Sequence, residues 1–288
     1  MTVSVLMAVY KAEKAENLER SMKSIWTYQT RKPDEIVLIE DGPLTQSLYQ
    51  TIDLWKEQLG DKLVICKNEQ NIGLTKSLNR GIPYVSSDLI ARMDSDDISD
   101  PLRFEKQVTY MESHPEIAVL GGSLKEVEGR MSQDEKGITF SGVKYSVRTY
   151  PTDPDVINRY ICKASPLCHA TVMMRKKIFK EGGIRYNENY ITSQDIALWF
   201  DVLCAGYKLT SIEDVTYYLE QADIISRRSR KKAWNEFKIY INGIYRMKGL
   251  FTMSYSYPVA RLLFRLIPKW MVKMIYGSSV RTKFLGGA

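Results

Sequence analysis

The sequence predicts an α/β fold: a mainly parallel sheet flanked by helices, with a basic helical extension at the C-terminal end. Two observations predict the sheet. Short apolar runs rich in Val and Ile alternate with segments of helical periodicity, and polar clusters directly follow several of these runs. A third observation, the uneven distribution of charge, sets the last part of the chain apart.

The strand–helix alternation occupies the first third of the chain. Buried strands are expected at Thr2–Val9, Glu35–Ile39, Leu63–Cys66 and Leu89–Met93, and helices at Asn17–Tyr28, Leu44–Leu59 and Gly73–Tyr84. Short links between such units place the strands in one parallel sheet. Because ligands bind at the carboxyl ends of parallel strands, we expect the polar residues that follow the strands to share one edge.

The following segment is more mixed. Strands are expected at Gly121–Val127 and Ala170–Met174, a polar loop or hairpin at Gly129–Gly142, and helices at Asp153–Cys162 and Gln194–Cys204. In the first of these helices, Asp153-Pro154 has the pattern of a cap followed by proline in the first turn.

Positive charge is concentrated in the tail. The whole chain has a net charge of +7, yet from Ile225 onward fourteen Lys and Arg stand against one acid, Glu236. The tail therefore carries +13, which leaves −6 for residues 1–224. We expect residues 1–225 to form one catalytic domain and residues 226–288 a basic tail that meets an anionic surface.

Cysteine and histidine usage argues against a zinc site. The four cysteines form no C-x-x-C pair, and the chain has two histidines. The first residues lack a basic segment followed by an apolar one, so no signal peptide is expected. We therefore expect reduced thiols in a cytoplasmic protein.

Asp94-Ser95-Asp96-Asp97 follows a predicted strand directly. Carboxylates at a strand end can turn toward one ligand, and Mg²⁺ or Mn²⁺ prefers such oxygens together with phosphates. Helix capping is the alternative; Asp100-Pro101 has that pattern, but capping leaves the other three acids unexplained. A calcium loop of the EF-hand type is excluded, because Ile98 and Ser99 occupy positions that need an acid or amide and a glycine.

The segment from Ala91 to Gln107 (ARMDSDDISDPLRFEKQ) resembles the signature of bacterial glycosyltransferase family 2. Ser4–Tyr10, Glu40-Asp41-Gly42 and Asn71–Leu74 match the same family in order and spacing, so the resemblance covers most of residues 2–220. It implies the Rossmann-like A-type fold and inverting transfer of a sugar from a nucleotide-sugar. It also implies Mn²⁺ or Mg²⁺ as a cofactor that neutralises the diphosphate leaving group.

The resemblance also implies donor-binding residues. Ala8, Val9 and Tyr10 would line the nucleobase pocket, and Asp41 would accept a hydrogen bond from the base, most readily from a uracil N–H. By itself, Asp41-Gly42-Pro43 fits a plain turn equally well.

Further donor contacts are expected around the acidic cluster. Asp94 and Ser95 would touch the ribose or the sugar, and Asp96 would ligate the metal. Lys76 and Arg92 could meet the diphosphate, but each could equally be a solvated charge or part of a core ion pair.

The resemblance places the catalytic base at Asp195, which would take the proton of the acceptor hydroxyl. The family pattern is Glu-Asp at the start of a helix; here Gln194 replaces the glutamate and is expected to meet the acceptor without a charge. The alternative is that Asp195 caps the helix or favours its dipole.

His169 stands where the family often has histidine followed by proline, although Ala170 follows it here. It would contact the acceptor, the diphosphate or the metal, or serve as a hydrogen-bonded structural histidine.

The tail contains an amphipathic pattern. Apolar residues recur at helical spacing and basic residues occupy another face: Val259, Leu262, Leu263, Leu266 and Ile267, against Arg261, Arg265 and Lys269. Pro268 interrupts the pattern, which resumes at Trp270, Met271, Met274 and Ile275. No apolar run approaches the roughly 20 residues of a spanning helix. The pattern favours a helix lying on an anionic membrane, with packing on the catalytic domain as the alternative.

These observations predict an inverting hexosyltransferase at the inner face of the cell membrane, which extends a lipid-linked oligosaccharide for capsule, exopolysaccharide or O-antigen. A nucleotidyltransferase acting on sugar phosphates is less favoured, because Ala8–Glu16 lacks the glycine of a phosphate loop. A nucleic-acid binder is disfavoured by the acidic remainder of the chain and the lack of a binding motif, so no nucleic-acid partner is expected.

Overall fold

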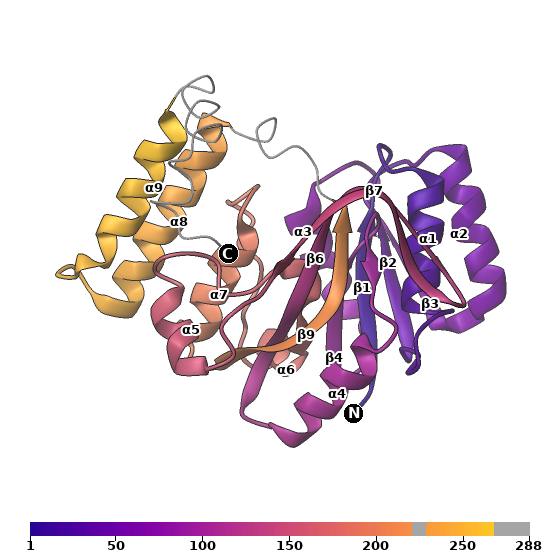
Figure 1. The fold of residues 1–288 in the computed structure, drawn as a ribbon, viewed down its shortest axis with the longest axis horizontal. Coiled ribbons are helices and arrows are strands. Elements are labelled where there is room, and N and C mark those ends of the chain that lie inside the picture. Colours follow the sequence, from indigo (N-terminus) through magenta and orange to yellow (C-terminus); the bar gives the residue numbers. More distant parts are fainter. Residues whose placement is uncertain (221–228, 268–288) are drawn as a thin grey trace.

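The computed structural model describes residues 1–220 and 229–267. These residues form a nine-stranded sheet of order β3-β2-β1-β4-β8-β6-β9-β5, with β7 paired to β6 (Figure 1). The strands are β1 Val3–Val9, β2 Glu35–Glu40, β3 Leu63–Lys67, β4 Leu89–Asp94, β5 Ile98–Ser99, β6 Ile117–Asp134, β7 Gly137–Arg148, β8 Met173–Arg175 and β9 Lys208–Glu220.

Helices cover both faces of this sheet and extend one end of the molecule (Figure 1). They are α1 Ala15–Ile25, α2 Gln46–Leu59, α3 Leu74–Gly81, α4 Arg103–Ser113, α5 Pro154–Tyr160, α6 Lys177–Lys180, α7 Gln194–Cys204, α8 Arg230–Lys248 and α9 Ser256–Leu266.

The parallel half of the sheet confirms the fold predicted from the sequence. β3, β2, β1 and β4 pair in parallel, and each expected helix connects two of them. In register, Val9 lies beside Glu40, and Ala8 beside Asp94. The polar residues after β1, β2 and β4 therefore share one edge of the sheet, as the carboxyl-end rule predicts.

Alternation along β1 feeds two hydrophobic layers. Val5 and Met7 pack with α1, α2 and α4 on one face, whereas Leu6 packs with α3, α7 and α8 on the other. A strand buried on both faces reads as a nearly continuous apolar run, as β1 does. Its polar residue, Ser4, is buried with its hydroxyl donating to Glu35.

The second half of the sheet is mixed. β8 is antiparallel to β4 and β6, and β6 is parallel to β9. The hairpin expected at Gly129–Gly142 is present as β6 and β7. The hairpin contacts α1, where the Arg20 guanidinium donates to the Met131 carbonyl at 3.2 Å.

Two local expectations need correction. The segment Ala170–Met174 is not all strand: a 3₁₀ turn, η3 (His169–Thr171), comes first, and β8 starts at Met173. Asp100 does not cap α4, which begins at Arg103. Its carboxylate accepts the Leu102 N–H at 3.0 Å and the Tyr218 hydroxyl at 3.0 Å, so it closes the turn before the helix and ties that turn to β9.

The described part of the tail packs on the rest of the chain. α8 adds Ile239, Tyr240 and Ile244 to the core cluster that contains α7, and α9 lies along α8 at the end of the molecule farthest from α1 and α2 (Figure 1). No helix within the described ranges is long and apolar enough to cross a membrane. The expected apolar and basic residues from Pro268 to Ile275 lie outside these ranges.

Candidate active site

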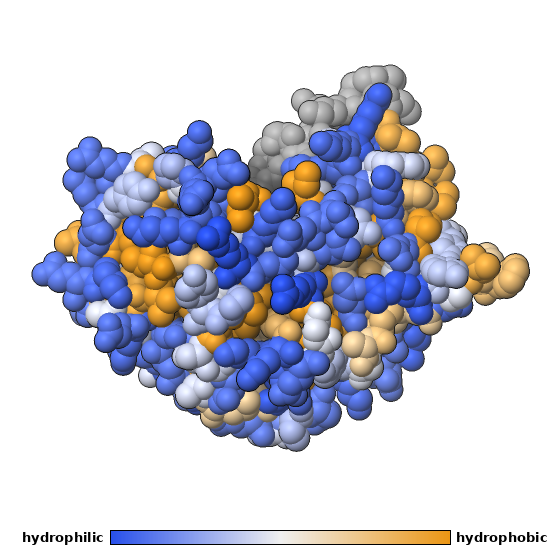
Figure 2. Space-filling view, turned by 180° about the vertical axis from the view of Figure 1, so that it is seen from behind, coloured by the Kyte–Doolittle hydropathy of each residue, from blue (hydrophilic) through white to orange (hydrophobic). Residues whose placement is uncertain are grey.

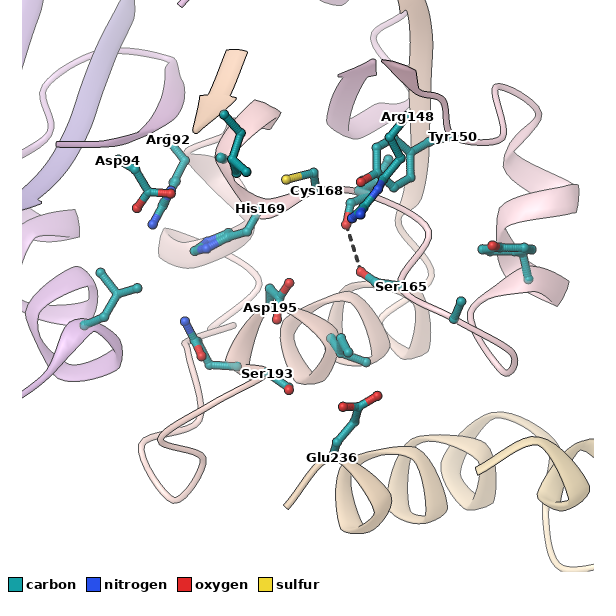
Figure 3. Close-up of a pocket in the computed structure, with 18 of the residues that line it drawn as sticks. Arg92, Asp94, Arg148, Tyr150, Ser165, Cys168, His169, Ser193, Asp195 and Glu236 are labelled. Atoms are coloured by element: carbon teal, nitrogen blue, oxygen red, sulfur yellow. Dashed lines mark hydrogen bonds and ion pairs between the residues drawn. The ribbon is translucent and has the colours of Figure 1, made fainter. Parts of the chain in front are cut away.

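A cavity of about 780 Å³ opens at the carboxyl edge of the parallel strands (Figure 3). Its wall is built by β4, η3, α7, α8 and α9, so segments far apart in sequence meet there. Five residues expected at the site line it: Arg92, Asp94, His169, Gln194 and Asp195. Figure 3 shows Asp94 and Arg92 on one side, His169 and Asp195 in the middle, and Arg148 and Tyr150 on the far side.

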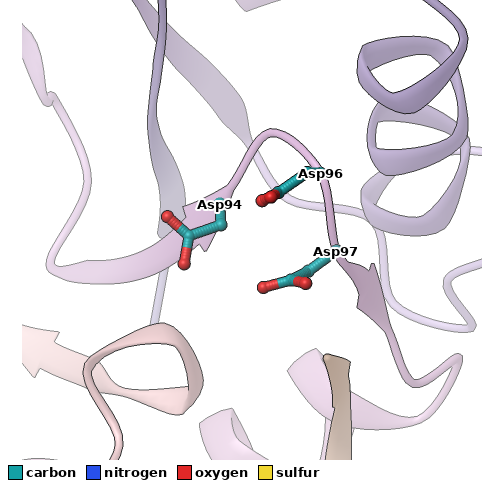
Figure 4. A group of neighbouring side chains, drawn as sticks. All are labelled: Asp94, Asp96 and Asp97. Carbon is teal, nitrogen blue, oxygen red and sulfur yellow. The ribbon is translucent and has the colours of Figure 1, made fainter. Parts of the chain in front are cut away.

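The acidic cluster forms where β4 ends. Ligand oxygens of Asp94, Asp96 and Asp97 lie within 4.8 Å of one another, and the three side chains share one space (Figure 4). The turn is held from α1, because the Ser21 hydroxyl donates to the Asp94 carbonyl at 2.9 Å. Ser95 is buried, and its hydroxyl donates to Glu13 at 3.3 Å, so the structure shows it supporting the loop.

These carboxylates repel one another. Burial, followed by the charges of Asp94 and Glu13, raises the pKa of Asp96 to about 6. Burial and the charges of Asp94 and Asp96 hold the pKa of Asp97 well above its ordinary value. Closely spaced carboxylate oxygens suit a hard divalent cation, which would relieve their repulsion, so the donor set fits Mg²⁺ or Mn²⁺. Asp97 was not assigned to the site from the sequence, although its position in the acidic run was the available signal.

Arg92 is buried and forms an ion pair with Asp94, whose side chain is 35% exposed. Burial disfavours the charge of Arg92, but the Asp94 carboxylate outweighs that effect and holds the pKa of Arg92 above its ordinary value. Of the alternatives left open by the sequence, the structure shows the ion pair, at a place where the guanidinium also lines the cavity. Lys76 is exposed on α3 and does not line it.

Asp41 is buried at the end of β2 and organises the start of α3. Its carboxylate accepts the backbone N–H of Ile72 at 2.8 Å and of Gly73 at 3.0 Å. The turn expected at Gly42 is real: its φ is 85°, and a Cβ there would lie 2.5 Å from the Asn71 nitrogen.

The other residues expected around the nucleobase of the donor lie at the end of β1. Ala8 is partly buried, Val9 is buried, and Tyr10 is 47% exposed. These positions lie beside the acidic cluster, because Ala8 pairs with Asp94 across the sheet.

Asp195 occupies the first turn of α7 and faces the cavity. The preceding Ser193 has φ 60° and ψ 27°, the left-handed region that is costly for a residue with a Cβ and often marks a functional site. Burial raises the pKa of Asp195, although the backbone N–H groups of Ile196 and Asp195 oppose the rise. A carboxylate with a raised pKa is a stronger base. Asp195 also accepts from a backbone N–H of the first turn, which is the contact that the helix interpretation expects.

His169 lies between Asp94 and Asp195 in the cavity wall (Figure 3). Its Nε2 is 2.7 Å from the Tyr186 hydroxyl, and its ring meets Trp199 edge-on. Burial, and then the charge of Arg92, holds the pKa of His169 well below its ordinary value, so the ring is neutral at physiological pH. Gln194 is buried beside Asp195, so an uncharged amide occupies the family's glutamate position.

Sequence reasoning missed the far wall of the cavity. Arg148 and Tyr150 come from the end of β7, Glu236 from α8, and Arg261 and Arg265 from α9. The available signal was Glu236, the single acid of the basic tail, but its arginine partners could not be identified from spacing along the chain.

The fold and this site define an enzyme class: a glycosyltransferase with the A-type fold. Residues 4–183 match Glycosyl transferase family 2, and the chain belongs to this family. The fold is shared with S. aureus TarS 1-349 in complex with UDP-GlcNAc, with a TM-score of 0.64 and 18% sequence identity over 100% of this chain and 76% of that one.

Two curated relatives extend over nearly the whole chain. The amylovoran biosynthesis glycosyltransferase AmsE of Erwinia amylovora is 33% identical over 280 residues, which cover 95% of this chain and 97% of that protein. The UDP-Gal:alpha-D-GlcNAc-diphosphoundecaprenol beta-1,3-galactosyltransferase of Escherichia coli is 29% identical over 282 residues, 96% of each chain.

Proposed function

We propose that this glycosyltransferase moves a sugar, with inversion, from a UDP-linked donor to a hydroxyl of a lipid-linked oligosaccharide in bacterial polysaccharide synthesis. One observation carries the proposal: Asp94, next to Asp96 and Asp97, and the carboxylate of Asp195 face the same cavity. The two relatives support the reaction class, one through its role in amylovoran biosynthesis and the other through its donor and diphosphoundecaprenol-linked acceptor.

In this proposal the donor lies at the carboxyl edge of the sheet. The nucleobase lies against Ala8, Val9 and Tyr10. Asp41 recognises the nucleobase, because Oδ2 of its carboxylate accepts, among the described residues, only the backbone N–H of Gly73 and keeps a lone pair for an N–H of the nucleobase. Asp94 holds the ribose or sugar. Asp96 holds Mn²⁺ or Mg²⁺, which when bound supplies positive charge to the diphosphate leaving group.

The acceptor then approaches from the side of Asp195. Its hydroxyl oxygen bonds to C1 of the sugar while the bond between C1 and the diphosphate oxygen breaks, and the diphosphate leaves with that electron pair. Asp195 receives the hydroxyl proton. His169, neutral and tied to Tyr186, and Gln194 position the acceptor through uncharged hydrogen bonds.

The proposed location is the inner face of the cell membrane, bound peripherally through the tail. Apolar side chains support it: Phe251 and Met253, in the connection between α8 and α9, are 99% and 85% exposed. Figure 2 shows hydrophobic residues gathered at the end of the molecule formed by these helices. Exposed apolar groups beside many cations suit an anionic membrane surface.

A thermal-shift screen of nucleotide-sugars with Mn²⁺ tests the proposal. We expect one UDP-sugar to raise the melting temperature in a metal-dependent way, followed by transfer to an extracted lipid-linked acceptor. The Asp96→Asn variant should lose the metal-dependent part of the shift. No response to any nucleotide-sugar, or turnover of a nucleoside triphosphate with a sugar phosphate, would contradict it.

A further inference from the structure

The cavity has two ends of different chemistry. Near β4 it presents the carboxylates of Asp94 and Asp195 and the guanidinium of Arg92, which is paired with Asp94. Its far wall presents three guanidinium groups, those of Arg148, Arg261 and Arg265, with the carboxylate of Glu236. The side chains of Tyr150 and Ser165 also line the far wall. The proposed transfer step uses none of these far-wall groups, although they occupy a large part of the cavity lining.

A buried glutamate holds two of the arginines in place. Glu236 has a side chain that is 5% exposed and accepts Arg261 at 2.8 Å and Arg265 at 2.6 Å. One carboxylate neutralises one guanidinium, so the trio keeps a net positive charge. Arg261 is further fixed over the Tyr240 ring at 5.2 Å, which limits the conformational entropy lost when an anion binds.

These arginines remain accessible from the cavity. The side chains of Arg261 and Arg265 are 31% and 40% exposed, and that of Arg148, across the cavity, is 52% exposed. Arg148 pairs with Glu126, whose side chain is 13% exposed, and part of its planar fork is left for a second acceptor. Guanidinium groups on opposite sides of the far end of the cavity suit a phosphate group, which arginine binds through paired hydrogen bonds.

Helix α9 has a second, apolar face. Arg261 and Arg265 are four residues apart and turn toward Glu236, while Val259, Leu263 and Leu266 are 43%, 62% and 44% exposed. One helix therefore offers cations to the cavity and a hydrocarbon row to the surface. That combination matches a ligand with an anionic head and an apolar tail.

We propose that the far wall of the cavity binds the diphosphate of a lipid-linked acceptor, held by Arg148, Arg261 and Arg265, with the lipid leaving along the apolar row of α9. The inference rests on the proposed function, for which it names the anchoring group of the acceptor. The glycan would then extend from the arginines toward Asp195, so the distance between diphosphate and reacting hydroxyl selects the length of the acceptor.

Isothermal titration calorimetry with farnesyl diphosphate, below its micellar concentration and in EDTA, tests the site without donor or metal. We expect the Arg265→Gln variant to bind at least about tenfold more weakly, the effect of losing one charge-assisted contact. The Arg148→Gln variant should show the same direction of change. The matched control is Lys238→Gln, which removes an equal charge from an exposed position on α8 outside the cavity and should bind within about twofold of the wild type.

Three outcomes would overturn the inference: no binding by the wild type, equal binding by wild type and both arginine variants, or equal weakening by Lys238→Gln. Inorganic pyrophosphate provides the second arm. Weaker binding of pyrophosphate than of farnesyl diphosphate supports a lipid ligand, whereas equal affinity would overturn the lipid assignment.

These experiments distinguish a loss of folding from a loss of diphosphate binding. Melting curves identify variants that lose structure, and Arg148→Gln, which does not touch Glu236, serves if Arg265→Gln is unstable. Because the titration needs no nucleotide-sugar, failure of the donor screen with intact prenyl-diphosphate binding would refute the proposed function alone. A successful donor screen without prenyl-diphosphate binding would refute this inference alone.

Discussion

Asp195 follows a strained backbone position, and its carboxylate has a raised pKa. Ser193 holds a left-handed conformation two residues earlier, and burial makes Asp195 a stronger base than an exposed aspartate. Capping alone would not require a left-handed residue before α7, and strained backbone of this kind often marks a functional site.

Replacement of this carboxylate gives the first prediction. Asp195→Asn should lower the turnover of sugar transfer by about 10²–10⁴-fold, because the acceptor proton loses its recipient. The donor-induced thermal shift should remain. The control is Asp201→Asn on the same helix, where the carboxylate pairs with Arg246 outside the cavity. Near-normal turnover in Asp195→Asn would exclude its role as base.

The acidic cluster predicts a pH-dependent response to metal. The pKa of Asp96 is raised from 3.8 to about 6, so the folded chain binds this proton more tightly than the unfolded chain does. Its contribution to stability is full below pH 3.8 and is lost as the pH rises through about 6. A cation can bind the Asp96 carboxylate, and so relieve the repulsion among the clustered carboxylates, only by displacing the proton from Asp96.

The second prediction follows from the direction of the pKa shift of Asp96. At about 100 times its dissociation constant, Mn²⁺ should add about 2.7 kcal/mol to the free energy of unfolding at neutral pH. The gain should shrink below the pKa of about 6 and be largely absent in Asp96→Asn. Thermal melts across this range measure it, with Asp134→Asn in the β6–β7 turn as control. A gain that is independent of pH would place the ion elsewhere.

At the scale of elements, the contact between α7 and α8 depends on a glycine. A Cβ on Gly243 would lie 2.3 Å from Cγ of Phe200, inside the ring's van der Waals surface. Phe200 is itself buried and stacks edge-on against Tyr240, so it has little room to move. The close approach of these helices brings Glu236 to the cavity wall.

The third prediction is that Gly243→Ala destabilises the protein. Overpacking costs about 1–3 kcal/mol, and alanine regains up to about 1 kcal/mol of helix propensity. Because Phe200 has little room to move, we take the upper overpacking cost and expect a net loss of about 2 kcal/mol. Denaturant unfolding measures it. Asn242→Ala, at the exposed neighbouring position, should be neutral or slightly stabilising. A stabilised Gly243→Ala would mean that the helices separate easily.

At the scale of the whole molecule, residues 1–224 carry a net charge of −6 and the tail from Ile225 onward carries +13. The exposed apolar side chains of the α8–α9 connection lie at the end remote from α1 and α2 (Figures 1 and 2). The arginines of α9 point inward to Glu236, contrary to the simple picture of a basic face turned to a membrane. In the proposed membrane binding, the apolar groups of the connection therefore supply the specific contact, and the remaining cations supply general attraction.

The fourth prediction concerns anionic vesicles. The wild type should co-sediment with them, and Phe251→Ser with Met253→Ser should weaken this binding at least about tenfold, since each large apolar side chain contributes about 1.5–3 kcal/mol when buried. Leu54→Ser is the control, because Leu54 is 66% exposed on α2 at the opposite end. Unchanged sedimentation of the double variant would exclude insertion of the connection.

Much of the fold could be predicted from sequence because its signals are local. The apolar runs of β1 to β4 and the helical periodicity between them are each read within one short segment, and short links leave one parallel arrangement. The acidic cluster is likewise a local signal, because it directly follows the predicted strand Leu89–Met93. His169 and Asp195 could be proposed beside it only through the resemblance to the family.

The sequence by itself determined the parallel half-sheet, the acidic cluster at the end of β4 and the concentration of charge in the tail. Only the tertiary structure decided that Asp97 joins that cluster, that Arg92 pairs with Asp94, and that Glu236 holds Arg261 and Arg265 at the cavity. The physical reason is separation along the chain. Glu236 lies on α8, and its position depends on how closely α8 packs against α7, a contact set by Gly243 and Phe200 together. No local pattern records such a contact, since neither residue is unusual until the other is placed against it.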